Sequence, residues 1–344
     1  MAKAARLKDV AAETGLSEAT VSRYLNSSIS LPPSTRQRID EAVARLRYKA
    51  NPQARSLSLG RSDQIGLVIP DLANPFFAQI AAVIELTADA CGLGLLLCTT
   101  SNRRTREMEY IHRLQQNQID GLLFITNHDD DGSVAAAINA TRGIVLLDED
   151  VVGAITPKIF ADNERGGRLA AQHLIEHGHR VIGIISGPLG LMSARERTQG
   201  VRHAVNKSRD AVISVEYTGN YTRDHGRISA ARLLQEHPGT TALFTGNDEI
   251  LVGVLEVLRD QGVSVPDMMS IVTFDDVEPL HLFNPPISAI RQDVAGMGNR
   301  AVHLLIDSSS SQRTFVTERI MVDLVVRASV AARSDTRSDK LQSA

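Results

Sequence analysis

Acidic, amide, arginine and aromatic residues follow short apolar runs at several places in the sequence, and these side chains could bind a ligand rich in hydroxyl groups. They are Asp71, Asn74, Phe76 and Phe77 after IGLVIP (65–70), Asp148 after GIVLL (143–147), Arg195 and Arg197 after VIGIIS (181–186), Asn247 and Asp248 after ALFT (242–245), and Asp275 and Asp276 after SIVTF (270–274). Carboxylates accept hydrogen bonds from hydroxyl groups, arginine donates in a fork, and aromatic rings stack on sugar rings. We expect Asp248 and Asp276 instead to cap helices or to make contacts between two lobes of the fold.

The apolar runs alternate with amphipathic segments, which predicts two units of parallel β-strands covered by helices on both faces. Beside the runs above we expect strands at 93–99, 121–125 and near 213–217, and helices at 76–90, 105–117, 163–177, 193–206, 222–236 and 248–261. A strand at 289–293, a helix to about 306 and strands to about 326 return toward the first unit, so the units are interleaved. Ligands of such sheets bind at the carboxyl ends of the strands.

Other reactive patterns in the sequence are weaker. His173 and His177 have the i, i+4 spacing of helical metal ligands, but no third ligand clusters with them, so we predict no metal site. HDDDG (128–132) is too short for a calcium loop, and we interpret it as a solvated turn. The sequence has neither a glycine-rich phosphate loop nor a nucleophile elbow. We therefore expect no cofactor and no enzymatic activity.

The first 62 residues of the sequence are basic, whereas the longer remainder is acidic. The 344 residues are 43% hydrophobic and carry a net charge of -3, but residues 1–62 alone carry +6. This asymmetry favours a polyanionic partner for the N-terminal segment. Cys91 and Cys98 lie in apolar surroundings and indicate a reducing compartment. Without a long apolar run or an apolar signal segment, we expect a cytoplasmic protein with no membrane partner.

The basic segment has the pattern of a helix-turn-helix. Leu7 and Val10 begin an amphipathic helix, and Gly15 permits the tight turn that follows it. Ser17 is suited to cap a second helix, running to about residue 25, and Ser34 a third. Two short helices joined by a glycine turn and supported by a third are typical of DNA-binding heads.

The second helix would enter the major groove of DNA. Glu18 can accept from cytosine, Ala19 can contact a thymine methyl group, and Arg23 can donate to guanine. We expect Ser22 to lie on the same face or leading end. Thr20 and Asn26 are predicted to contact phosphates, which position the protein without reading the base sequence.

A known family resembles this sequence over residues 7–57. LKDVAAETGLSEATVSRYLN (7–26) and RYKANPQARSL (47–57) look like the head and hinge of the lactose-repressor (LacI/GalR) family of transcriptional regulators. The resemblance implies hinge helices, paired between two subunits, that enter the minor groove. Leu57 would wedge a base step there, with Ala54 and Arg55 beside it, and the bent DNA would offset the cost of unstacking.

The resemblance also implies a two-lobed body like that of periplasmic sugar-binding proteins, so the fold class is an N-terminal helix-turn-helix head plus two α/β lobes of parallel sheets. The implied effector contacts are Phe76, Phe77, Asp148, Ser193, Arg197, Tyr221, Asn247, Asp275 and Gln292. Leu191 stands where purine-binding relatives carry an arginine, which disfavours a purine. The expected domains are a head (1–49), a hinge (50–62), a first lobe (63–161 and 292–320), a second lobe (162–290 and 321–330) and a polar tail (331–344).

These features together predict a sequence-specific DNA-binding regulator, a repressor of sugar or sugar-acid metabolism genes. The expected partners are a near-palindromic operator, a second copy of the chain and a sugar, sugar acid or sugar phosphate bound between the lobes. The tail lacks a leucine heptad, so we expect a homodimer rather than a tetramer. The alternatives are a broad metabolic regulator that senses a phosphorylated sugar, and a sugar receptor or sugar-modifying enzyme without a regulatory role.

Overall fold

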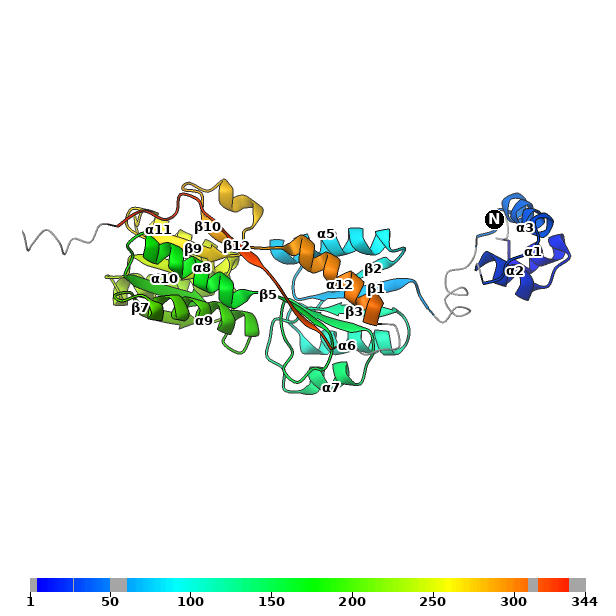
Figure 1. The fold of residues 1–344 in the computed structure, drawn as a ribbon, viewed down its shortest axis with the longest axis horizontal. Coiled ribbons are helices and arrows are strands. Elements are labelled where there is room, and N and C mark those ends of the chain that lie inside the picture. The colour runs from blue at the N-terminus through cyan, green and yellow to red at the C-terminus, as the bar shows by residue number, and fades with distance from the viewer. Residues whose placement is uncertain (1–4, 27, 50–60, 309–314, 334–344) are drawn as a thin grey trace, which may run out of the picture. The chain divides into compact units, whose positions relative to one another are not determined.

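The computed structural model describes residues 5–26, 28–49, 61–308 and 315–333 (Figure 1). They form a helical head, residues 5–49, and an α/β body, residues 61–333. The predicted hinge contacts Ala54, Arg55 and Leu57 lie outside the described residues.

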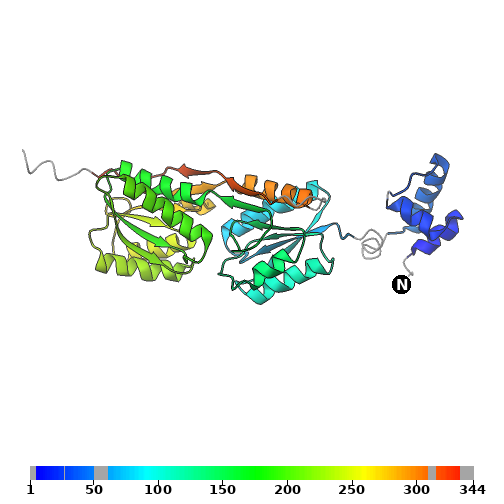
Figure 2. The ribbon, with the colours of Figure 1, turned by 60° about the horizontal axis from the view of Figure 1, so that its bottom comes forward.

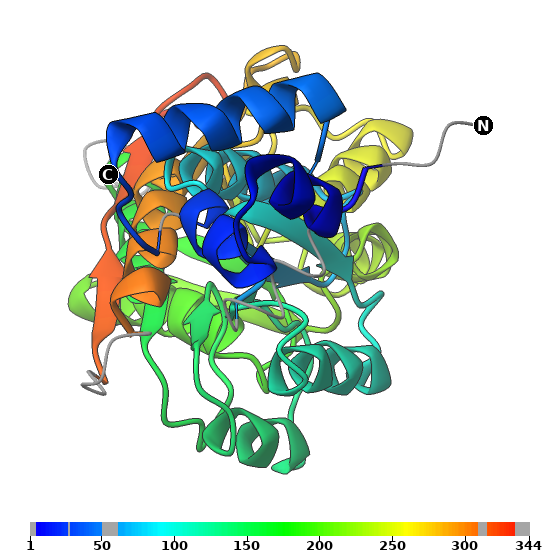
Figure 3. The same cartoon turned by 90° about the vertical axis from the view of Figure 1, so that its right-hand side faces the viewer.

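Three helices make up the head: α1 (Leu7–Thr14), α2 (Glu18–Leu25) and α3 (Pro33–Leu46), drawn in blue in Figures 1 and 3. They enclose a small core of Val10, Ala11, Val21, Ile39 and Ala42. Gly15 ends α1 at a φ of 64°, in the left-handed region that glycine adopts without strain. The hydroxyl oxygen of Ser17 accepts from the backbone N–H of Thr20 and caps α2, as expected.

The expected cap of the third helix is wrong. Pro32 occupies the cap position of α3 and Ser34 is already the second helical residue, with Pro33 before it. Proline suits the first helical position because its fixed φ is helical and its missing N–H would have no partner there. The helix therefore begins earlier than a serine cap would place it.

The first lobe of the body is built on a six-stranded sheet (Figures 1 and 2). Its strands, in spatial order, are β11 (Thr317–Ile320), β5 (Lys158–Ala161), β4 (Ile144–Leu147), β3 (Gly121–Phe124), β1 (Gln64–Ile69) and β2 (Gly94–Thr99). Helices α5 (Pro75–Ala90) and α12 (Val294–Ser308) lie on one face, and α6 (Arg104–Gln115) and α7 (Ser133–Asn139) lie on the other.

A second six-stranded sheet forms the other lobe. Its strands, in spatial order, are β12 (Val322–Val325), β10 (Ser288–Gln292), β9 (Ser270–Phe274), β8 (Ala242–Thr245), β6 (Val181–Ser186) and β7 (Val212–Thr218). Helices α8 (Asn163–Glu176) and α9 (Met192–Lys207) pack on one face, and α10 (Arg223–Glu236) and α11 (Asp248–Asp260) on the other (Figure 2). A short 3-10 helix, η1 (Glu278–His281), follows β9.

The structure differs from the sequence-based expectation at two strands. The sequence pattern does not predict β5, whose four residues KIFA begin with a lysine instead of an apolar residue. β12 runs antiparallel to β10, although parallel sheets were expected. Only residue 321 separates β11, which joins the first sheet, from β12, which joins the second. Within the described residues the chain passes between the sheets three times: after β5, after β10 and after β11.

Parallel pairing brings the ends of several strands to one edge of each sheet. β3 pairs in parallel with β4 in the first lobe, and β8 pairs in parallel with β9 in the second. Asp148 directly follows β4, Asn247 lies two residues beyond β8, and Asp275 directly follows β9. The carboxyl ends of these strands therefore present polar side chains where ligands of open α/β sheets bind.

Candidate effector site and DNA-binding head

A cavity of about 280 Å³ in the body gathers the polar side chains at the strand ends. All nine residues predicted to contact an effector line it: Phe76, Phe77, Asp148, Ser193, Arg197, Tyr221, Asn247, Asp275 and Gln292. They come from both lobes, since Phe76 and Phe77 begin α5 and Asp148 follows β4, whereas the others belong to the second lobe.

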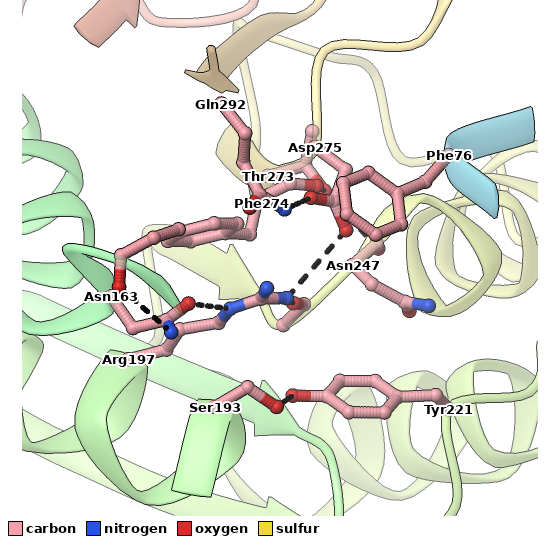
Figure 4. A network of polar contacts seen from close by, with 12 residues as sticks. Phe76, Asn163, Ser193, Arg197, Tyr221, Asn247, Thr273, Phe274, Asp275 and Gln292 are labelled. Atoms are coloured by element: carbon pink, nitrogen blue, oxygen red, sulfur yellow. Dashed lines mark hydrogen bonds and ion pairs between the residues drawn. The ribbon is translucent and has the colours of Figure 1, made fainter. Parts of the chain in front are cut away.

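Arg197 is the most constrained of these side chains (Figure 4). It is only 4% exposed, its Nε donates to Asn163 Oδ1 at 2.8 Å, and its Nη1 donates to the backbone oxygen of Gly246 at 2.8 Å. Nη1 also lies 3.5 Å from Asp275 Oδ2, and the guanidinium stacks on the Phe274 ring at 3.7 Å. These contacts fix the direction in which Arg197 can donate to a ligand.

Close packing of α8 against α9 places Asn163 beside Arg197. A Cβ atom at Gly167 of α8 would overlap the backbone oxygen of Arg197, and a Cβ atom at Gly200 of α9 would overlap that of Glu164. Glycine is required at both positions because the two helix backbones come so close together.

Two further second-lobe residues of the cavity wall each use one side-chain polar group in a hydrogen bond within their lobe. Gln292 Nε2 donates to Asp275 Oδ1 at 2.6 Å, while Gln292 Oε1 is buried without a hydrogen-bond partner in the described part of the chain. Asn247 uses its side-chain oxygen to cap α11 by accepting from the N–H of Ile250, which leaves its NH₂ group as a donor.

Asp148 faces Arg197 from the first lobe. Its Oδ1 is buried and has no hydrogen-bond partner among the described residues. Burial raises the pKa of Asp148 to about 7, although the charge of Arg197 opposes that rise. Such a carboxyl group lacks the hydrogen-bond donor that would stabilise its charged form.

Aromatic side chains supply the apolar part of the wall. The rings of Phe76 and Phe77 meet edge to face with centroids 5.4 Å apart. The Tyr221 hydroxyl lies 3.4 Å from the Ser193 hydroxyl (Figure 4), and burial raises the pKa of Tyr221 to about 12. Together with the polar groups, these rings suit a ligand with hydroxyl groups around an apolar ring face.

The cavity also includes residues that sequence reasoning missed. Thr126 and Asn127 line it just beyond β3, and Glu149 lines it immediately after Asp148. All three residues follow a strand closely, so the pattern that identified Asp148 could have identified them too. Arg195, which was paired with Arg197 in the sequence, is exposed and does not line the cavity; it donates to the backbone oxygens of residues 189 and 190.

Two other predicted patterns have structural explanations. His177 Nδ1 lies 2.8 Å from the backbone oxygen of His173 near the end of α8, and no three metal-binding side chains converge in the described ranges. In the 128–132 turn, the Asp130 carboxylate accepts from the N–H groups of Val134 and Ala135 at the start of α7.

In the head, α2 presents a polar surface. Glu18, Ala19 and Arg23 are exposed, whereas the other predicted contacts Thr20, Ser22 and Asn26 are partly buried. The Tyr24 hydroxyl donates to the Asp40 carboxylate at 3.0–3.1 Å, which ties α2 to α3. A helix held in this way can present its exposed residues to the major groove.

Comparison with known proteins assigns the chain to a family. Residues 6–51 match the model for bacterial regulatory proteins of the lacI family, and residues 171–330 match that for a periplasmic binding protein-like domain. The HTH-type transcriptional repressor PurR of Mannheimia succiniciproducens is 30% identical over 329 residues, which cover 95% of this chain and 98% of the relative. The chain belongs to the lacI family.

Two further lacI-family similarities extend over both parts of the chain. The ribose operon repressor of Bacillus subtilis is 32% identical over 302 residues, which cover 88% of this chain and 91% of the relative. The crystal structure of the Lac repressor dimer bound to operator and the anti-inducer ONPF has a TM-score of 0.84 at 29% identity, covering 96% of this chain and 100% of that chain.

Membership of the lacI family determines the general activity. The chain is a DNA-binding transcriptional repressor of the lacI family, and like other repressors of this family it is not an enzyme. None of the helices that the structure describes is long and apolar enough to cross a membrane.

Proposed function

We propose that this lacI-family repressor is controlled by a small uncharged sugar or polyol that binds between its two lobes. The observation that carries the proposal is the pair of buried acceptors without partners in the described residues, Asp148 Oδ1 and Gln292 Oε1, beside the fixed donor Arg197. Hydroxyl groups can donate to both acceptors and accept from the guanidinium. The ligand would remove two unsatisfied polar groups from the body.

The size of the cavity favours a ligand of about one sugar ring. Its volume of about 280 Å³ lies just below the range of about 300–1,000 Å³ for small-molecule sites. Phe76, Phe77 and Tyr221 offer ring faces against which a sugar can stack.

The charge of the cavity disfavours an anionic effector. Five acidic side chains line it, against the two arginines Arg197 and Arg223: Asp71, Asp148, Glu149, Glu249 and Asp275. Arg223 pairs with Glu256, and Arg197 is already bonded. With Arg195 outside the cavity, no pair of free arginines among its lining residues favours a sugar acid or a sugar phosphate.

For the DNA complex, we propose that the α2 residues assigned from the sequence contact a near-palindromic operator, with Glu18, Ala19 and Arg23 at base edges. Residues 50–62 would link head to body, with Leu57 as the wedge in the minor groove. The regulated genes would serve sugar metabolism, as the name of the Bacillus subtilis ribose operon repressor says of that relative. We expect a dimer in the cytoplasm.

Control would follow from the two-lobed construction. A ligand that contacts Asp148 from the first lobe and Arg197 from the second binds one arrangement of the lobes better than others. A change in the arrangement of the lobes would alter the spacing of the two hinge segments in the dimer and thereby operator affinity.

A thermal-shift screen of the full-length chain against neutral sugars, polyols, sugar acids, sugar phosphates and purines tests the proposal. A ligand at about 100 times its dissociation constant adds about 2.7 kcal/mol to the stability of the folded state. We expect stabilisation by neutral sugars or polyols, and a change in operator affinity with the same compound. Stabilisation by phosphates or purines alone would refute an uncharged sugar as the effector.

A further inference from the structure

Glu149 makes an unusual contact between the two lobes. It follows Asp148 at the end of β4 in the first lobe and is 2% exposed. Its Oε1 accepts from the N–H of Met192 at 2.7 Å, and its Oε2 accepts from the N–H of Ser193 at 3.2 Å. These are the first two N–H groups of α9, in the second lobe.

The first N–H groups of a helix have no partner within it and carry partial positive charge, so the start of a helix attracts anions. Leu191, the residue before α9, offers no side-chain acceptor. The carboxylate of Glu149 occupies this position, and burial raises the pKa of Glu149 while the hydrogen bonds from α9 oppose the rise.

The start of α9 belongs to the wall of the effector cavity. Both Glu149 and Ser193 line that cavity, and Arg197 lies one turn further along the same helix. An anionic group of a ligand would find N–H donors and a guanidinium here, but the carboxylate already bonded to the N–H groups excludes it by charge and by volume.

We propose that Glu149 determines effector specificity: its carboxylate fills the anion-binding position at the start of α9 and thereby excludes anionic ligands from the cavity. The inference rests on the proposed function, because it explains how the same site rejects sugar acids and phosphates. Glu149 is a positioning residue for α9 as well, but positioning alone would not govern which charge the cavity accepts.

Replacement of Glu149 by alanine tests the proposal with inorganic phosphate as the probe. In the full-length Glu149→Ala chain, the N–H groups of Met192 and Ser193 lose their bound carboxylate. We expect saturable phosphate binding by calorimetry, about tenfold or more tighter than in the wild type. Glu149→Ser provides a second variant if the alanine form fails to fold, because a serine side chain is also too short to reach the N–H groups at the start of α9.

Glu249→Ala is the matched control. Glu249 lines the same cavity from the first turn of α11, and its removal changes the cavity charge equally without freeing the start of α9. We expect little gain of phosphate binding in this variant. Equal gains of phosphate affinity in the Glu149 and Glu249 variants would mean that only the net charge of the cavity matters, which would overturn the proposal. The absence of any gain in folded Glu149 variants would overturn it as well.

The two proposals fail in distinguishable ways. If no neutral sugar or polyol stabilised the wild type, the proposed effector class would be wrong. The phosphate comparison between the Glu149 and Glu249 variants would still decide whether Glu149 blocks an anion-binding position.

Discussion

Asp148→Asn separates the stability of the body from its capacity to bind an effector. Asp148 Oδ1 is buried without a hydrogen-bond partner in the described residues, and its backbone φ is 68°. Asparagine has nearly the same shape and tolerates this left-handed conformation as well as aspartate does. The substitution therefore removes a charge with little strain and no cavity.

The size of the effect follows from the pKa of Asp148. Burial raises that pKa from 3.8 to about 7, and one unit corresponds to about 1.36 kcal/mol, so the shift alone corresponds to about 4 kcal/mol. Since Asp148 is partly exposed, solvent reduces this cost. We expect Asp148→Asn to increase the unfolding free energy by about 1–3 kcal/mol above neutral pH, because the neutral amide avoids the cost of burying a charge.

The sign of the pH dependence is fixed by linkage. The folded chain holds the Asp148 proton more tightly than the unfolded chain, so wild-type stability decreases as the pH rises from about 4 to about 7. The amide that Asp148→Asn introduces cannot titrate in this range. The stability advantage of the variant should therefore be small at about pH 4 and reach its full size at about pH 8.

Melting temperatures of the full-length proteins across this pH range measure the difference, and about 2–4 °C is expected for each kcal/mol in a domain of 150–250 residues. Asp71→Asn makes the same chemical change at an exposed position of the cavity and should bring no gain of stability, because an exposed carboxylate stays hydrated. Neutral-sugar affinity should fall by about 10- to 100-fold in Asp148→Asn, because a charged acceptor is lost. The reasoning would be refuted if the gain of stability in Asp148→Asn did not change with pH, or if the variant were less stable than the wild type at about pH 8.

Three other substitutions test separate parts of the molecule. Ser17→Ala removes the α2 cap and should destabilise the head by about 1 kcal/mol, seen as weaker operator binding by fluorescence anisotropy; unchanged binding would contradict the role of the cap. Leu57→Ala should weaken operator binding and leave effector binding intact, and wild-type operator affinity would refute the hinge wedge. Arg197→Lys keeps the charge but lacks the planar guanidinium whose Nε and Nη1 bond Asn163 and Gly246, so calorimetry should show greatly reduced sugar binding with operator binding retained; wild-type sugar affinity would exclude Arg197 from the site.

Much of the fold could be predicted because its strands are continuous apolar runs. β6 and β9 carry such runs, and each is followed by a helix or a short connection with polar residues. β5 escaped prediction although it is as long as the predicted β8, because its segment KIFA begins with a charged residue whereas ALFT begins with an apolar run. The antiparallel direction of β12 depends on its partner β10, which is distant in sequence, so no local pattern could reveal it.

The candidate site was predictable in its members but not in its geometry. Position after a strand identified Asp148 and Asp275, but it did not show that Arg195 points away from the cavity while Arg197 is buried in it. Both arginines lie on α9, two residues apart, so a 3.6-residue period puts them on different faces. Only the packing of α9 against α8 decides which face is buried.

Two buried acceptor oxygens in the cavity wall connect ligand binding to regulation. Asp148 Oδ1 comes from the first lobe and Gln292 Oε1 from the second, and neither has a hydrogen-bond partner in the described residues. One ligand with a hydroxyl group at each acceptor can donate to both of them only when the two lobes are close enough for the ligand to bridge them. The binding free energy then depends on the distance between the lobes, and this dependence is what an allosteric ligand needs in order to change operator affinity.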